Sequence, residues 1–488
     1  MKPTQRSILA VLTVLLAAAA SQAQPPGEAA EAERALGFVR TLNSGDGVRL
    51  LAYMQENWVP AKDEAERNTR WSQFAAKLIE DHADVEIAGV SVERPGELTV
   101  LTRGSDGSPL SFIFAFESNP PYRIVSLSLD VGGGPAGAEL PAFAVADGAT
   151  QVEIAAALHA WFALLVADDL FSGTALVAWK GEPVFAGAWG LASKRWNVPN
   201  QPDTRFDLGS INKSFTKIAV GQLVSKGKLS LDDVIADHLP DYPSPEVARK
   251  VTLRNLLEHS AGLGDIFTEE FLKSDKAQYR QPEDFFWLFA GKEPEFEPGS
   301  RQSYSNAGFM VLGAIIAAVS GEPYDQYVIR HIFTPAGMDR AGFFAHDEPV
   351  ADVAEGYTHR GAKGEEDAWL SNVLMLPARG NSAGSAQATA VDLLRFDNAI
   401  REYRLLSPAY TQWYFGGAEP AADEVKSAQE GRARAAAGIA GGAPGVSACL
   451  ESDGDLAVIV LSNYDPPITE QVAQALSKPL ARAMFYAK

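Results

Sequence analysis

The pattern of apolar residues divides the chain into a shorter and a longer part. In the first part, apolar positions recur at helical spacing from Glu28 to about Ile79. Four short runs that alternate apolar and polar residues follow, over about 85–92, 98–102, 110–116 and 122–129. Turn-forming pairs such as Pro95-Gly96 and Asp106-Gly107 separate these runs. Helices followed by antiparallel strands predict a small α+β domain over residues 24–131.

A glycine-rich stretch then interrupts the pattern, and we assign residues 132–149 to a Gly/Pro-rich linker. The rest, residues 150–488, forms a second domain. Its pattern predicts two β-hairpins, over 174–189 around Lys180-Gly181 and over 446–461 around Asp453-Gly454. Helices are expected over about 152–170 and 468–486. The apolar run 307–319 is too short to cross a membrane, and it predicts a buried helix.

Composition and charge narrow the range of partners. With 488 residues, 46% apolar and 21% charged, the chain has the composition of an ordinary globular protein. Its net charge is -20, from 62 acidic and 42 basic residues. This balance argues against nucleic acid or an anionic membrane surface as the main partner.

The first residues have the pattern of a secretory signal peptide, which we assign to residues 1–23. Lys2 and Arg6 precede an apolar run, and Ser21-Gln22-Ala23 gives a small-x-small cleavage site. We therefore expect an exported protein, periplasmic or secreted, without a transmembrane anchor after cleavage. The single cysteine, Cys449, excludes an internal disulfide, and its apolar surroundings predict a buried thiol.

A serine at a predicted helix start is the first candidate for chemistry. Gly209 precedes Ser210, and an apolar stripe from Ile211 to Leu223 predicts the helix. The free N–H groups of a first turn favour a developing anion, and Lys213 projects from the same face as Ser210. A buried, neutral amine there would serve as the base for a serine nucleophile. The alternative is a serine that caps the helix beside a solvated lysine.

The same S-x-x-K spacing occurs twice more, at Ser214 with Lys217 and at Ser225 with Lys228. Ser214 falls inside the predicted helix and Ser225 at its polar end, so only Ser210 has the helix-start context.

Tyr304-Ser305-Asn306 is a second candidate, directly before the buried helix. It is the only Tyr-x-Asn in a chain with 13 tyrosines. A phenol can pass a proton between nucleophile and leaving group, and an amide can hold a substrate carbonyl. The alternative is a tyrosine that anchors a loop and an asparagine that caps the helix.

Together these motifs resemble the serine hydrolases related to class C β-lactamases, a family that also includes D-alanyl-D-alanine carboxypeptidases and esterases. The resemblance covers about residues 150–487. Besides the Ser210 and Tyr304 blocks, it rests on these motifs in chain order: Phe171-Ser172-Gly173, Trp196-Asn197-Val198-Pro199, Gly227-Lys228-Leu229-Ser230-Leu231-Asp232-Asp233, Leu256-Leu257-Glu258-His259-Ser260-Ala261-Gly262-Leu263, Ile332-Phe333-Thr334-Pro335-Ala336-Gly337-Met338 and Ala390-Val391-Asp392-Leu393-Leu394-Arg395-Phe396.

The resemblance implies an α+β fold in which an antiparallel sheet flanked by helices meets a mostly helical lobe at a cleft. It implies Ser210 as the acylated nucleophile, Lys213 as its activating amine, Tyr304 as proton relay and Asn306 as a substrate-binding residue. His259 belongs to a turn motif of the family and is expected to be structural. No metal-ligand spacing, phosphate loop or nucleotide fingerprint is found, so we expect no metal and no cofactor. The first domain resembles NTF2-like modules in the order of its elements.

The third family motif departs from the usual pattern. Members carry Lys-Thr-Gly or His-x-Gly on an inner strand, and here Ile439 stands at the position of the lysine or histidine. Gly441 and Gly442 keep the thin backbone that lets a strand approach a substrate. They are therefore assigned to substrate binding, with the Gly442 N–H as an oxyanion donor beside that of Ser210. Arg432 and Arg434, just upstream, could supply the missing cation.

The sequence thus predicts an exported serine hydrolase that cleaves an ester or amide in a small-molecule or peptide-like substrate through a Ser210 acyl-enzyme. Because Ile439 cannot bind a carboxylate, esterase-like activity is favoured. Two alternatives are a catalytically silent binding or scaffold protein, and a weak D-Ala-D-Ala carboxypeptidase or β-lactamase.

The signal pattern makes a testable prediction about the mature chain. Cleavage after the small-x-small site should leave Gln24 as the first residue, because Ala23 and Ser21 occupy the small positions. N-terminal sequencing of the exported protein measures this. A mature chain in the membrane fraction that still begins at Met1 would refute it.

Overall fold

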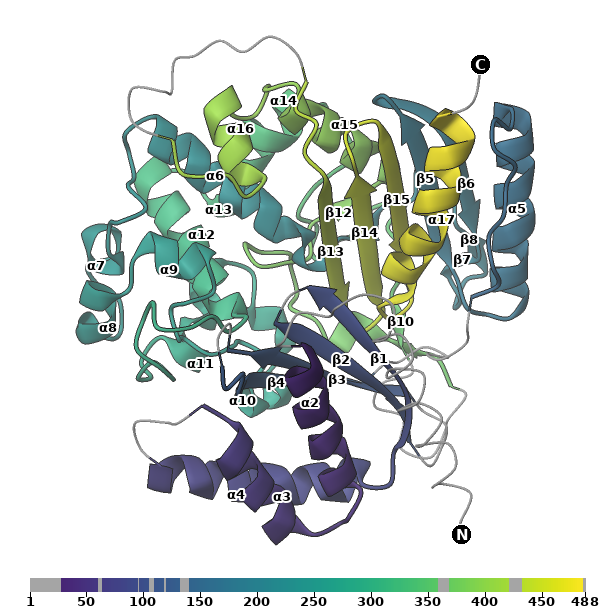
Figure 1. Cartoon of the computed structure of the whole chain (residues 1–488). Helices are drawn as coiled ribbons and strands as arrows, with labels where there is room; N and C mark the ends of the chain where they lie inside the picture. The colour runs from purple at the N-terminus through teal and green to yellow at the C-terminus, as the bar shows by residue number, and fades with distance from the viewer. Residues whose placement is uncertain are drawn as a thin grey trace, which may run out of the picture. The chain divides into compact units, whose positions relative to one another are not determined.

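The structure is a computed structural model that describes residues 28–59, 64–94, 96–104, 109–117, 120–131, 140–358, 368–420 and 432–485. The predicted signal peptide lies outside these residues. The chain divides into two compact units, residues 1–138 and 139–488, and each is described by itself (Figure 1).

In the described residues of the first unit, three helices precede a four-stranded antiparallel sheet in the order β1-β2-β3-β4. Its elements are α2 (Glu28–Leu42), α3 (Gly47–Asn57), α4 (Glu64–His82), β1 (Glu86–Arg94), β2 (Glu97–Arg103), β3 (Pro109–Phe116) and β4 (Ile124–Val131). Its core includes a cluster of aromatic rings, in which Phe38 packs edge-on against Phe112 and Phe114. This is the predicted order of elements, and the resemblance to NTF2-like modules stays a prediction.

The linker differs from its predicted extent of residues 132–149. Residues 140–149 pack onto the second unit, where Phe143 and Ala149 are buried. The Trp161 indole donates a 2.6 Å hydrogen bond to the carbonyl of Pro141, and the Gly148 N–H binds the carbonyl of Ala483. Apolar side chains among the glycines and prolines therefore bind this segment to the unit that follows it.

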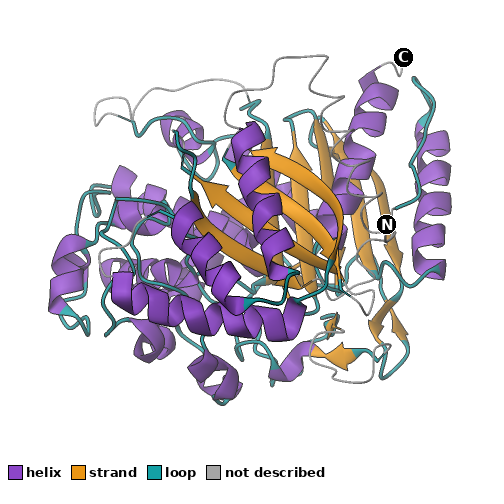
Figure 2. Cartoon of the chain, turned by 60° about the horizontal axis from the view of Figure 1, so that its bottom comes forward, coloured by secondary structure: helices purple, strands orange, loops and turns teal. Residues whose placement is uncertain are grey.

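A five-stranded antiparallel sheet forms the centre of the second unit, in the order β13-β14-β15-β5-β6 (Figures 1 and 2). Its strands are β5 (Gly173–Trp179), β6 (Glu182–Trp189), β13 (Ala437–Ala443), β14 (Val446–Ser452) and β15 (Leu456–Ser462). The strands from the two ends of the unit meet where β15 pairs with β5. Both predicted hairpins are present, and β13 extends one of them as an edge strand.

Helices cover both faces of this sheet, which explains why its strands read as nearly continuous apolar runs. Along β15, Val458 and Val460 face a layer formed by α5 (Gln151–Ala167) and α17 (Ile468–Phe485). Ile459 and Leu461 face the larger core, which contains the remaining helices. Cys449 lies in the first layer and is buried as predicted, and burial raises the pKa of its thiol.

Further helices and several short strands complete the unit. They are α6 (Asn212–Ser225), α7 (Ile235–His238), α8 (Pro245–Lys250), α9 (Leu253–Leu257), α10 (Glu269–Lys273), α11 (Phe286–Phe289), α12 (Asn306–Ser320), α13 (Tyr324–Val328), α14 (Thr334–Ala336), α15 (Ala390–Arg401) and α16 (Pro408–Tyr414), with β7 (Leu191–Ser193), β8 (Val198–Pro199), β9 (Phe206–Asp207), β10 (Tyr357–Thr358), β11 (Leu370–Ser371) and β12 (Gln387–Ala388). Within the described ranges no single helix is long and apolar enough to cross a bilayer. By length and composition, α12 and the segment Tyr324–Ala336 would together be long and apolar enough, but the chain bends by 75° between them. As predicted, α12 is largely buried in the core.

Candidate active site

Ser210 lies in a tight turn between a short strand and α6. The chain leaves β9, makes the 3-10 turn Gly209–Ile211, and enters α6 at Asn212. Gly209 has φ +48°, which favours glycine, and a Cβ there would meet the Gly442 nitrogen at 2.7 Å. The predicted helix start is therefore one 3-10 turn in front of the α-helix, and the glycine is required by both conformation and space.

The amine of Lys213 lies among three oxygen atoms from three separate segments. Its Nζ is 3.0 Å from Ser210 Oγ, 2.8 Å from Asn306 Oδ1 and 2.7 Å from the carbonyl oxygen of Ala383. The rings of Tyr304 and Phe309 lie 4.9 and 5.5 Å from it. Although the residue as a whole is only partly buried, these groups enclose the amine.

Burial lowers the pKa of Lys213 to about 7, and the negative charge of Asp265 partly opposes this shift. A substantial neutral fraction is therefore present near neutral pH. A neutral amine has two hydrogens and one lone pair. The carbonyl oxygens of Asn306 and Ala383 can accept only hydrogens, so the lone pair is left for the hydroxyl of Ser210. This is the arrangement that a general base for Ser210 needs.

Tyr304 reaches Ser210 from the segment in front of α12, with 2.7 Å between the phenol oxygen and Ser210 Oγ. The whole residue is 55% exposed, but its hydroxyl points toward the enclosed Ser210–Lys213 pair. Burial of that hydroxyl raises the pKa of Tyr304 to about 12, so the phenol keeps its proton at neutral pH. The ring of His259 stacks on that of Tyr304 at 4.7 Å, and its Nδ1 accepts the N–H of Ser305. His259 thus supports the tyrosine and makes no described contact with Ser210.

Asn306 begins α12, and a residue that the sequence analysis missed holds its side chain. The amide nitrogen of Asn306 donates to both carboxylate oxygens of Asp265, at 3.1 and 2.9 Å. The backbone N–H of Asn306 donates to the same carboxylate at 3.2 Å. Asp265 follows the predicted Ser260–Leu263 turn motif, and only this position after a glycine-rich turn could have marked it in the sequence.

The segment 381–386 supplies the carbonyl of Ala383, and no motif in the sequence pointed to this role. Asn212 holds it from α6: its amide donates to the Asn381 carbonyl at 2.9 Å and accepts the N–H of Ala386 at 3.1 Å. Thr216, one turn further along α6, donates to the carbonyl of Ser382 at 2.7 Å. These buried polar contacts fix the carbonyl of Ala383 relative to Lys213.

Strand β13 runs past the Ser210 turn with almost no room between the two backbones. A Cβ on Gly441 would lie 2.0 Å from the carbonyl oxygen of Leu208 and 2.6 Å from the Ser210 nitrogen. In the β13–β14 hairpin, Ala443 and Val446 are the pair that closes a two-residue turn. Because ladder hydrogen bonds alternate, the N–H of Gly442 then points to the free edge of β13, beside the turn that carries Ser210. The backbone is thus arranged as an oxyanion site requires.

Ile439 lies on the same face of β13 as Gly441, two residues before it, and is partly buried against the larger core. The two upstream arginines do not replace the missing cation. Arg432 donates to Asn398, whose amide binds the carbonyl of Gly181, and Arg434 lies 3.9 Å from Asp455. Gly181 lies in the β5–β6 turn and Asp455 in the β14–β15 turn. Both turns are at the opposite end of the β13–β14 hairpin from Gly441.

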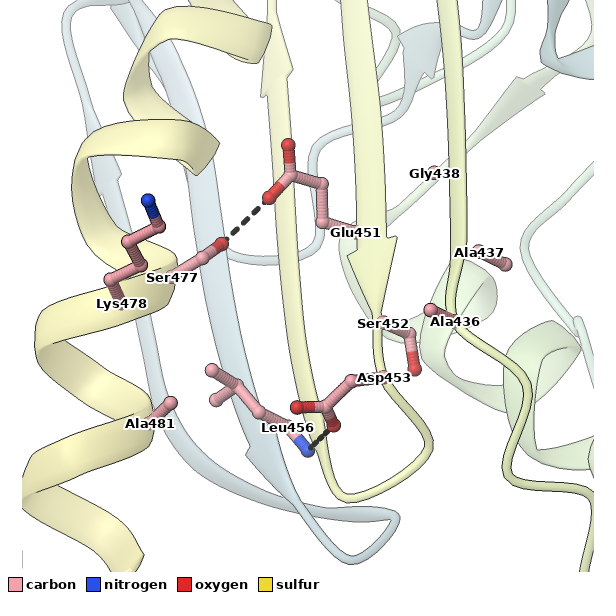
Figure 3. A pocket seen from close by; sticks show the side chains of 10 residues that line it. All are labelled: Ala436, Ala437, Gly438, Glu451, Ser452, Asp453, Leu456, Ser477, Lys478 and Ala481. Atoms are coloured by element: carbon pink, nitrogen blue, oxygen red, sulfur yellow. Dashed lines mark hydrogen bonds between the residues drawn. The ribbon is translucent and has the colours of Figure 1, made fainter. Parts of the chain in front are cut away.

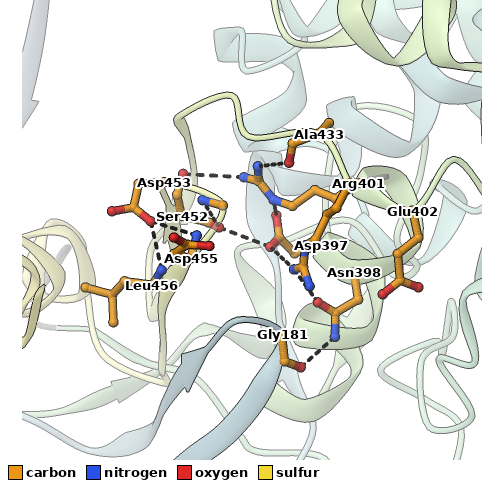
Figure 4. A network of polar contacts seen from close by, with 12 residues as sticks. Gly181, Asp397, Asn398, Arg401, Glu402, Ala433, Ser452, Asp453, Asp455 and Leu456 are labelled. Atoms are coloured by element: carbon orange, nitrogen blue, oxygen red, sulfur yellow. Dashed lines mark hydrogen bonds and ion pairs between the residues drawn. The ribbon is translucent and has the colours of Figure 1, made fainter. Parts of the chain in front are cut away.

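A buried ion pair organises that opposite end (Figure 4). Arg401, fully buried, binds Asp397 at 2.8 Å and the carbonyls of Ala433 and Ala435 at 3.2 and 2.7 Å. Arg432 is 3.8 Å from the same Asp397. The prediction that Arg432 or Arg434 could bind a substrate carboxylate beside Ser210 is therefore wrong. Both arginines lie at the end of the folded hairpin that is remote from Ser210.

A cavity of about 480 Å³ lies at that same end of the sheet, between β13, β14 and α17 (Figure 3). It is lined by Glu451, Asp453, Ser477 and Lys478 among others, and Glu451 accepts a 2.7 Å hydrogen bond from Ser477. None of the proposed site residues lines it. In the part of the chain that the structure describes, no group of three or more His, Cys, Asp or Glu side chains is placed to hold a metal ion.

Known proteins are similar to this chain, and the part that the family model matches lies in the second unit. The Beta-lactamase family model matches residues 158–482. A Bacillus subtilis protein named as a penicillin-binding protein is 33% identical over 244 residues, 49% of this chain and 56% of that protein. The Burkholderia gladioli esterase EstB is 33% identical over 187 residues, 36% of this chain and 47% of the esterase. The crystal structure of a penicillin-binding protein from Bacillus halodurans gives a TM-score of 0.56 at 32% identity, over 64% of this chain and 98% of that one. The chain spans slightly more than half the length of the first curated relatives it matches.

The contact between β13 and the Ser210 turn predicts that alanine substitutions at two glycines of this strand differ in their effect on stability. Gly441→Ala should lower the free energy of unfolding by about 1–3 kcal/mol, because its Cβ would meet backbone atoms that have no room to move. Gly438→Ala is the matched control, since a Cβ there meets nothing within 4 Å. Urea unfolding of both variants measures the difference. Equal stability of the two would contradict the close approach.

Proposed function

The chain belongs to the Beta-lactamase family, and on that premise we propose that it is a serine hydrolase that cleaves an ester or amide through an acyl-enzyme on Ser210. The proposal rests on one observation above the others. Ser210 Oγ lies within hydrogen-bond distance of both the Lys213 amine and the Tyr304 phenol, at 3.0 and 2.7 Å. The silent-scaffold alternative gives no reason for this arrangement of amine and phenol around one hydroxyl.

In the proposed reaction Ser210 Oγ attacks the carbonyl carbon of the substrate, and its proton passes to the neutral amine of Lys213. The N–H groups of Ser210 and Gly442 bind the oxyanion that forms on the carbonyl oxygen. Tyr304 gives its proton to the departing alcohol or amine as the bond to the carbonyl carbon breaks, and the Lys213 ammonium restores the phenol. Water then attacks the acyl carbon and gives up a proton to the same pair. The acid leaves and the Ser210 hydroxyl is restored.

We propose a preference for neutral esters. A substrate carboxylate is held well by a cation or a charge-assisted hydrogen bond, and Ile439 offers neither. Its partly exposed apolar side chain suits an uncharged acyl or alcohol group, and Arg432 and Arg434 are bound elsewhere. The similarity to an esterase supports this preference. The proposal includes export, on the pattern of residues 1–23, to the periplasm or the medium.

Labelling with a fluorophosphonate tests the nucleophile and its base together. We expect one adduct on the wild type and none on Ser210→Ala. The labelling rate should rise between about pH 5 and 9 with a midpoint near the Lys213 pKa of about 7, because only the neutral amine accepts the serine proton. Tyr304, with a pKa of about 12, should cause no loss within that range.

Ser214→Ala and Ser225→Ala are the matched controls, since each removes the serine of another S-x-x-K pair, and both should still be labelled. Equal labelling of Ser210→Ala would remove the assignment. A rate that does not change with pH would remove Lys213 as the base.

Substrate preference is tested by comparing a short-chain p-nitrophenyl ester with a chromogenic cephalosporin. The wild type should hydrolyse the ester faster than the cephalosporin. Ile439→His should reduce the ratio of the two rates by roughly ten- to a hundredfold, the usual effect of one charge-assisted contact. Cephalosporin turnover at or above the ester rate in the wild type would contradict the ester preference. Activity on neither substrate, but gained in Ile439→His, would favour a silent scaffold.

A further inference from the structure

We propose that Asp265 is the positioning residue of this site: its carboxylate fixes the amide of Asn306 so that the lone pair of Lys213 is directed at Ser210. This inference rests on the proposed function and concerns the same site. Asp265 makes no described contact with Ser210 or Lys213. It acts through Asn306, whose side-chain nitrogen and backbone nitrogen both donate to it.

The two ends of the Asn306 amide face different neighbours. Its nitrogen lies 2.9 and 3.1 Å from the carboxylate oxygens of Asp265, and its oxygen lies 2.8 Å from Lys213 Nζ. Turning the amide over would bring its oxygen against two carboxylate oxygens, which repel it. An ionised Asp265 therefore permits only one orientation of the amide.

That orientation decides where the Lys213 lone pair goes. With the amide oxygen toward Lys213, the amine donates one hydrogen to Asn306 and the other to Ala383. If the amide were reversed, its nitrogen would donate to the lone pair and compete with the hydroxyl of Ser210. The carboxylate of Asp265 thus keeps the amine available as a base without touching it.

Asp265 also sets the charge at the amine. Among the residues that the structure describes, it is the one charged group whose field raises the pKa of Lys213, against the larger effect of burial. The other titratable groups near the amine are the Tyr304 phenol and, behind it, the imidazole of His259. The segment 381–386, which meets the amine through the carbonyl of Ala383, contains no charged residue. Removing the carboxylate should therefore lower the pKa of Lys213.

The carboxylate of Asp265 also has contacts that a purely structural residue would make. It accepts hydrogen bonds from the backbone N–H groups of Ile266 and Phe267 at 2.6 and 3.1 Å. Those contacts form a local turn that any Asp or Asn could make. They predict an effect of substitution on stability but none on the pH dependence of the reaction. The pH dependence therefore separates the two roles.

The experiment follows fluorophosphonate labelling of Ser210 against pH in the full chain. In Asp265→Asn and Asp265→Ser we expect two changes relative to the wild type. The midpoint of the rise moves to lower pH, because the negative charge is gone. The plateau rate falls by roughly tenfold or more, the usual cost of a lost charge-assisted hydrogen bond, because the Asn306 amide is free to turn.

Glu295→Gln is the control, because it removes a negative charge beside Gly264, the neighbour of Asp265, without a described contact to the site residues. It should keep the wild-type midpoint and plateau. A plateau that falls in the Asp265 variants with an unmoved midpoint, or no change in either, would overturn the inference. Loss of the folded state in both variants would assign Asp265 to the fold instead. Absence of a Ser210 adduct in the wild type would overturn the proposed function as well.

Discussion

The enclosure of one amine is the constraint on which this site depends. A lysine surrounded by apolar rings and carbonyl oxygens loses much of its hydration, and its pKa falls to about 7. An uncompensated buried amine would destabilise the fold, so its hydrogens must find acceptors. Two segments far apart in sequence provide these acceptors, carrying Asn306 and Ala383, and Ser210 Oγ lies 3.0 Å from the amine beside them. Their positions relative to one another are fixed because each segment is packed into the larger core.

The approach of two backbones is the second constraint. The Ser210 turn and the edge strand β13 come so close that a single Cβ on Gly441 would overlap the carbonyl of Leu208. Nothing but glycine leaves the N–H groups of both segments free to face one reacting oxygen. The polar contacts of Asn212 and Thr216 hold the turn from behind, so the backbone geometry is supported by buried hydrogen bonds as well as by packing.

Two arginine side chains lie near the beginning of β13 and not near Ser210. Strand β13 carries no cation beside Ser210, and Ile439 occupies the position at which the family resemblance led us to expect a lysine or histidine. At its other end, Arg401 and Arg432 gather around Asp397. A fully buried arginine needs several acceptors, and the carbonyls of Ala433 and Ala435 serve as two of them. Arg401 and Arg432 thus stabilise the beginning of this strand and lie away from Ser210.

The sequence by itself predicted the main helices and hairpins, and it offered Ser210 with Lys213 as one candidate motif. Helical and alternating apolar periods reflect burial on one face of an element, so they located α6, α12 and the hairpins, and the spacing of Ser210 and Lys213 required only one helix turn. Tyr304 and Asn306 were found as an isolated motif, but their meeting with Ser210 was decided by tertiary packing. Asp265 and the carbonyl of Ala383 could not be predicted, because a turn aspartate and a backbone oxygen acquire their roles only through neighbours distant in sequence. The fate of Arg432 and Arg434 was likewise decided by the fold: proximity along a strand does not give proximity to a site when the strand runs away from it.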